Sequence, residues 1–115
     1  MILTVIWLFI VLLLSIIPTK DLPTEDQTDK VVHFIIYGIT ALLFLKVLRL
    51  RTTLTKSIIL SVGLASFFGL VMELLQSILP WREFSLLDEL ANIGGAFFFT
   101  ILYVLRDYYR KQLWG

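Results

Sequence analysis

The sequence has 115 residues, of which 58% are hydrophobic, with a mean hydropathy of +0.89 and a formal net charge of only +1. A soluble domain of this size could not cover its surface with so few polar groups, so the composition predicts a membrane protein. The near-neutral charge gives no indication of a nucleic-acid partner. The lack of cysteine excludes disulfides and thiolate chemistry, and the lone His33 excludes a multi-histidine metal site within one chain.

Four apolar runs separated by polar connectors predict one all-α domain over residues 1–115, an integral-membrane four-helix bundle. The first run is slightly short and ends at Pro18, which cannot continue a helix. Thr28 or Asp29 is suited to cap the second helix and Ser85 the fourth. The predicted transmembrane helices cover about residues 1–17, 30–48, 57–79 and 86–105.

The placement of Lys and Arg predicts the orientation of the bundle. Connector 46–56 carries four of these residues and tail 106–115 carries three, which together make seven of the ten. Because Lys and Arg favour cytoplasmic loops, this connector and both chain termini are predicted to be cytoplasmic. Connector 18–28 and turn 80–83 then face the outside.

Polar residues gather at the predicted outer ends of three helices: the start of the second, the end of the third and the start of the fourth. A charge at the centre of a membrane helix costs roughly 2.5–3.5 kcal/mol, so their convergence predicts a polar pocket at the outer face. The candidate residues are Asp29, Lys30, His33, Glu73, Gln76, Arg82, Asp88 and Asn92. Spacing by three and four also predicts one face of the third helix made of Gly63, Ser66, Gly69, Glu73, Gln76 and Ser77.

Most of these residues also have ordinary explanations. Asp29 and Asp88 near helix starts could act as caps, and Lys30 and Glu89 could be solvated at the interface. The whole set could form a polar network that only holds the helices together. Glu73 differs from the others because an intramembrane carboxylate is a functional candidate by default.

The segments DKVVHFIIYG (29–38), MELLQ (72–76), Arg82 with Ser85, and DELANIGGA (88–96) resemble the VanZ-like family of small bacterial membrane proteins. The resemblance covers the three later helices. The family's founding member is associated with low-level resistance to teicoplanin, a glycopeptide, and the family has been proposed to include proteins that process lipid head groups. The resemblance implies a multi-pass protein of the bacterial inner (plasma) membrane whose site is formed by the eight candidates above.

Two functions are compatible with these residues. The first is a hydrolase or transferase acting on the head group of a phospholipid or lipid-linked cell-wall intermediate. Its catalytic residues would be His33, Glu73 and Asp88, and its binding residues Asp29, Lys30, Gln76, Arg82 and Asn92. The second is a non-catalytic binder of such a lipid, or a structural membrane protein. No motif demands a cofactor or assigns a metal ligand, although a divalent cation would suit carboxylates beside phosphate. Transport ranks last, because four helices would need an oligomer to form a path.

Overall fold

The computed structural model describes residues 1–16, 26–80 and 86–114, and only the backbone of residues 26–29 and 114. These residues form four α-helices and no strand, which confirms the prediction of an all-α fold. The helices are α1 (Ile2–Ile16), α2 (Asp26–Leu48), α3 (Leu54–Ile78) and α4 (Leu86–Trp114).

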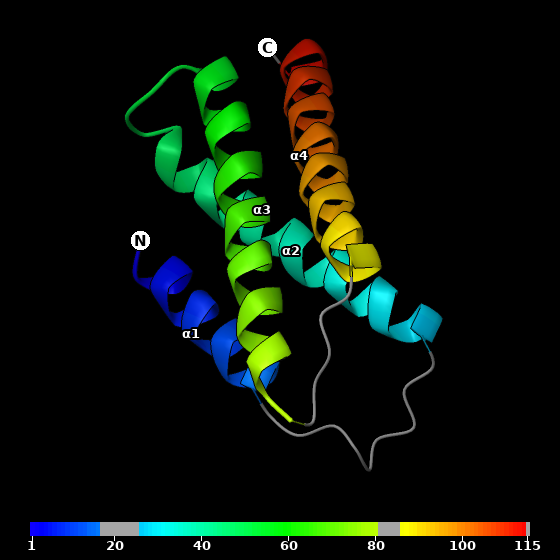
Figure 1. The fold of residues 1–115 in the computed structure, drawn as a ribbon. Helices are drawn as coiled ribbons and strands as arrows, with labels where there is room; N and C mark the ends of the chain where they lie inside the picture. Colours follow the sequence, from blue (N-terminus) through cyan, green and yellow to red (C-terminus); the bar gives the residue numbers. More distant parts are fainter. Residues whose placement is uncertain (17–25, 81–85, 115) are drawn as a thin grey trace.

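Successive helices run in alternating directions, and α2 crosses α3 and α4 obliquely (Figure 1). Helix α2 packs against the other three helices, whereas α1 packs against α2 and α3. The end of α2 and the end of α4 therefore lie at one end of the molecule. The start of α2, the end of α3 and the start of α4 lie towards the other end, which places the predicted polar residues near one another (Figure 1).

Three helical segments are long and apolar enough to cross a membrane: Lys30–Leu48, Leu54–Ile78 and Leu86–Leu113. Helix α1 has 15 residues, which corresponds to a length of about 22 Å. This is shorter than the hydrocarbon core of a bilayer, at about 30 Å. The described residues therefore support a multi-pass membrane protein with three of the four predicted spans.

Within the described part of the chain, two hydrogen bonds attach the short helix α1 to its neighbours. Trp7 Nε1 donates to Thr40 Oγ1 of α2 at 2.8 Å, and Gln76 Nε2 of α3 donates to the carbonyl oxygen of Ser15 at 3.1 Å. Ser15 lies in the last turn of α1, where carbonyl groups lack a partner within their own helix. Gln76 therefore gives a hydrogen-bond partner to a buried carbonyl group at the end of α1, which would be costly to leave unpaired.

Helix α2 begins at Asp26, so Thr28 and Asp29 lie within its first turns and the prediction that one of them caps the helix is wrong. Most polar residues have ordinary helix propensity, so the polar character of this segment does not by itself end the helix. The predicted cap Ser85 lies outside the described residues.

Two further helix boundaries lie outside the predicted ranges, at the start of α3 and at the end of α4. Helix α3 begins at Leu54 because Thr53 caps it, with its hydroxyl accepting a hydrogen bond from the backbone N–H of Lys56 at 3.4 Å. Helix α4 continues past the predicted end at 105, and Asp107 pairs with Lys111 one turn later at 3.3 Å.

The predicted polar face of α3 is partly wrong. Gly69, Glu73 and Gln76 are buried as expected, but Gly63 and Ser77 are exposed. At 100° per residue, Gly63 and Ser77 lie about 80° and 40° from Glu73, both on the same side of it. The buried residues of α3 lie on the other side of Glu73, away from Gly63 and Ser77. Glu73 is therefore at the edge of the buried face rather than at its centre. The buried residues of the helix are Ser57, Ser61, Val62, Ala65, Gly69, Met72, Glu73 and Gln76.

Candidate functional site

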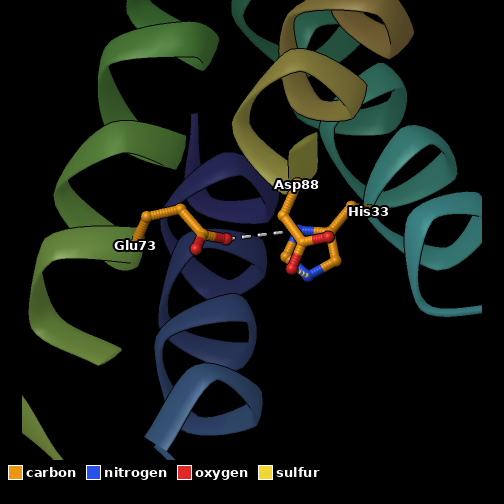
Figure 2. Close-up of side chains that lie close together, drawn as sticks. All are labelled: His33, Glu73 and Asp88. Carbon is orange, nitrogen blue, oxygen red and sulfur yellow. Dashed lines mark ion pairs between the residues drawn. The ribbon is translucent and has the colours of Figure 1, made fainter. Parts of the chain in front are cut away.

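Three helices bring one ionisable side chain each to the same place. His33 of α2, Glu73 of α3 and Asp88 of α4 point toward one another (Figure 2). His33 Nδ1 lies 3.7 Å from Glu73 Oε1, and His33 Nε2 lies 3.7 Å from Asp88 Oδ2. The exposed fraction of the Glu73 side chain is 1%, against 12% for His33 and 13% for Asp88. The three residues predicted as catalytic are therefore neighbours, in a largely dry environment.

Asn92 holds His33 in one orientation. Its Oδ1 lies 2.9 Å from His33 Nδ1, while its Nδ2 donates to Glu89 Oε1 at 3.2 Å. A carboxylate only accepts hydrogen bonds, so Glu89 fixes which end of the amide is the donor. The oxygen of Asn92 therefore faces the imidazole, and Nδ1 must carry a proton to donate to it. The second nitrogen, Nε2, is left facing Asp88.

Glu89 is a site residue that the sequence did not reveal. The interpretation that it is solvated at the interface is wrong, because it is 6% exposed and accepts the hydrogen bond from fully buried Asn92. The spacing of three residues between Glu89 and Asn92, which places both on one helical face, is the signal that could have identified it.

One residue of α2, Tyr37, and one of α3, Gly69, lie beside the hydrogen-bonded residues of the site. The Tyr37 ring is buried and stacks with the His33 ring, with centroids 6.2 Å apart. A Cβ on Gly69 would lie 2.7 Å from Asn92 Nδ2 and 3.0 Å from Glu89 Oε1. The backbone of α3 thus passes directly beside the amide, and only glycine leaves it enough room.

The remaining predicted binding residues are less closely tied to this cluster. Gln76 is buried and uses its Nε2 to bind α1, as described above. Lys30 is partly buried at the same end of α2. The side chain of Asp29 and all of Arg82 lie outside the described residues.

This arrangement leaves His33 Nε2 with two chemical options. When Nε2 is unprotonated, its lone pair can accept a proton or bind a cation. When Nε2 is protonated, both ring nitrogens carry a proton and the ring is an imidazolium ion flanked by Glu73 and Asp88. A cation bound to Nε2 and an imidazolium ring would each place a positive charge between Glu73 and Asp88. That charge would offset the repulsion between the two carboxylates, which is strong in a medium of low dielectric constant.

The sequence is 36% identical over 115 aligned positions to the uncharacterized protein C11E3.10 of fission yeast, Schizosaccharomyces pombe. The alignment covers 95% of this chain and 67% of the relative. The chain belongs to the family of this yeast protein. The family has a eukaryotic member, so it is not confined to bacteria, and the comparison gives no support to the expected bacterial membrane or to glycopeptide resistance.

No family model matches the chain, and no solved structure matches it. Within the family, the alignment extends over nearly the whole chain, so the relationship is not restricted to one helix. Membership of the VanZ-like family remains a prediction from the motifs.

Proposed function

We propose that this protein binds and chemically processes the head group of a phospholipid or a lipid-linked cell-wall intermediate. The observation that carries the proposal is the meeting of His33, Glu73 and Asp88, each from a different helix, at one end of an apolar bundle. Ionisable side chains within membrane segments are costly and usually mark a site of function. The resemblance of the surrounding motifs to the VanZ-like family supports the same class of substrate.

The proposed reaction is hydrolysis or transfer at the head-group phosphate. His33 Nε2 takes a proton from the attacking hydroxyl, a bond forms from its oxygen to phosphorus, and the phosphorus–oxygen bond to the leaving group breaks. The proton held on Nε2 then passes to the departing oxygen. Asn92 keeps Nδ1 protonated throughout, and the carboxylates of Asp88 and Glu73 stabilise the transient imidazolium ion.

Two basic residues would hold the phosphate: Lys30 of α2 and Arg82, which the sequence places in the connector between α3 and α4. Lys30 supplies a compact charge, and Arg82 supplies paired donors that match two phosphate oxygens. The remaining binding groups proposed are Asp29 and Gln76. The basic connector 46–56 and the basic tail support an orientation with both termini cytoplasmic and the site at the outer face, which requires α1 to cross the membrane as a fourth span.

A non-catalytic binder is the second candidate. It is favoured by the burial of the site, since fully buried Asn92 and 1%-exposed Glu73 are also what a rigid polar network between helices requires. Such a protein would hold a lipid head group without converting it.

The test is lipid turnover by the full chain in nanodiscs made from a total lipid extract, followed by mass spectrometry. We expect His33→Ala and Glu73→Gln to lower turnover on the order of 100-fold or more, as for the loss of a general base. Asp107→Asn, at the opposite end of α4, is the control and should retain turnover. Turnover by His33→Ala at the wild-type rate would overturn the proposal, and binding without product would favour the second candidate.

A further inference from the structure

We propose that His33, Glu73 and Asp88 form a binding site for one divalent transition-metal ion, of the zinc or manganese class. The site itself stands on geometry alone, whereas the catalytic role given to the ion rests on the proposed function. One ligand atom from each residue lies within 4.8 Å of the other two. Ligand atoms held ~2.0–2.2 Å from an ion are at most about 4.4 Å apart, so small side-chain movements close the site.

The donor set selects the class of metal. One imidazole nitrogen and two carboxylates suit zinc, iron and manganese, whereas magnesium and calcium favour sites made of oxygen alone. Three protein ligands also leave at least one coordination position open, as in catalytic rather than structural zinc sites. A water molecule or a phosphate oxygen of the lipid would fill that position.

The hydrogen bonds around His33 prepare its nitrogen for a metal. A histidine ligand usually donates its other N–H to a carbonyl or carboxylate oxygen, which fixes the ring and its tautomer. Here Nδ1 faces Asn92 Oδ1 at 2.9 Å, and Asn92 is in turn held by Glu89. Nε2 is thereby left as the ligand atom beside Asp88, whereas Glu73 lies 3.7 Å from Nδ1 and has to turn toward Nε2 to share the ion.

The charges at this end also favour a doubly charged cation. Glu73, Asp88 and Glu89 are all buried, and the cationic candidates among the described residues here are Lys30 and His33. A divalent ion between Glu73 and Asp88 offsets their mutual repulsion without protonating His33. Once bound at Nε2, the ion would occupy the lone pair that the metal-free reaction uses for proton transfer, so His33 would act as a ligand and not as the base. The ion itself would then polarise a phosphoryl oxygen and activate a bound water molecule for attack, and the proton of that water would pass to solvent.

The experiment uses the full chain, carrying a tag without histidine, stripped with EDTA in detergent and dialysed against Zn²⁺, Mn²⁺ or Mg²⁺. Bound metal is measured by elemental mass spectrometry, and the visible spectrum of the Co²⁺-loaded protein reports nitrogen and oxygen ligands. We expect about one Zn²⁺ or Mn²⁺ per wild-type chain and a loss of affinity on the order of 100-fold or more for His33→Ala and Asp88→Asn. Asn92→Ala should lose roughly 10- to 100-fold, because it removes only the orienting partner of the histidine.

Asp107→Asn, which removes a carboxylate at the other end of α4, should bind like wild type, and helical circular dichroism checks that each variant is folded. A wild-type chain that binds none of these ions, equal binding by folded Asp88→Asn, or a preference for Mg²⁺ would overturn the site. Metal binding without lipid turnover would support the site and overturn the proposed enzyme. Turnover that survives stripping with EDTA would support the enzyme and overturn the role of the ion.

Discussion

At the scale of single residues, the geometry of the site depends on an uncharged amide. Asn92 is fully buried and makes one hydrogen bond to His33 and one to Glu89. Replacing either partner would leave a buried polar group unsatisfied, which costs about 1–3 kcal/mol. The amide therefore determines which imidazole nitrogen is available for chemistry, although it carries no charge itself.

The space that Asn92 occupies depends on Gly69, which gives the first prediction. In Gly69→Ala, the new Cβ would lie 2.7 Å from Asn92 Nδ2, so the amide must move away from His33. We expect lipid turnover and metal affinity to fall at least tenfold while the helices still form. Turnover assays and the metal-binding measurement, with circular dichroism as a check of folding, test this expectation.

Gly63 of the same helix provides the matched control. A Cβ at Gly63 meets nothing within 4 Å, so Gly63→Ala should keep the site intact. Alanine also favours a helix over glycine by about 0.5–1 kcal/mol, so this variant should unfold at a slightly higher temperature. Equal loss of function in both variants would contradict the role given to Gly69.

At the scale of helices, the fold depends on how closely α2 and α4 approach. Gly95 of α4 lies against the backbone of Phe34 in α2, and the neighbouring residue Ala96 is fully buried. Small residues allow such contact, and van der Waals packing of this kind is one of the forces that hold membrane helices together. The same contact holds His33 of α2 and Asp88 of α4 at a fixed separation.

The second prediction compares two adjacent glycines. A Cβ on Gly95 would overlap the carbonyl group of Phe34, which cannot move without displacing α2. Gly95→Ala should destabilise the bundle by about 1–3 kcal/mol, the usual cost of overpacking. A thermal unfolding experiment in detergent measures the change.

Gly94→Ala is the control for this experiment. Its Cβ would lie 3.6 Å from the Phe34 ring, which is an ordinary contact distance. We therefore expect its unfolding temperature to stay close to that of wild type. If Gly94→Ala and Gly95→Ala lose the same stability, the effect would come from helix flexibility rather than from packing between α2 and α4.

At the scale of the whole molecule, most acidic residues lie towards one end of the bundle and most basic residues towards the other. The carboxylates of the site lie where α3 ends and α4 begins, whereas the connector between α2 and α3 is basic. Helix α3 has 25 residues, or about 37 Å, enough to place these ends on opposite sides of a bilayer. This separation leads to a prediction about sidedness.

The third prediction uses the lack of native cysteine. Single cysteines replacing exposed Pro80, at the site end, and exposed Arg51, at the basic end, should react with a membrane-impermeant thiol reagent from opposite sides. Gln112→Cys in the last turns of α4 should react from the same side as Arg51→Cys. Labelling in intact cells and in inverted vesicles gives the result, and labelling of Pro80→Cys from the cytoplasm would contradict an outer-face site.

Much of this organisation follows from the sequence. Apolar runs of sufficient length dictate helices in a membrane, because backbone groups in lipid must bond within their own segment. Helices joined by short connectors run in alternating directions, so polar residues at the start of α2, the end of α3 and the start of α4 had to reach the same end. The proximity of His33, Glu73 and Asp88 was predictable for this reason.

The tertiary structure alone decided how these residues contact one another. Sequence periodicity placed both Gly63 and Gly69 on one face of α3, but packing against α2 and α4 buries Gly69 and leaves Gly63 exposed. The burial of Glu89 and the tautomer of His33 depend on groups from different helices meeting within hydrogen-bond distance. Periodicity fixes the approximate face of one helix, whereas a hydrogen bond requires the positions of two helices to agree within a few tenths of an ångström.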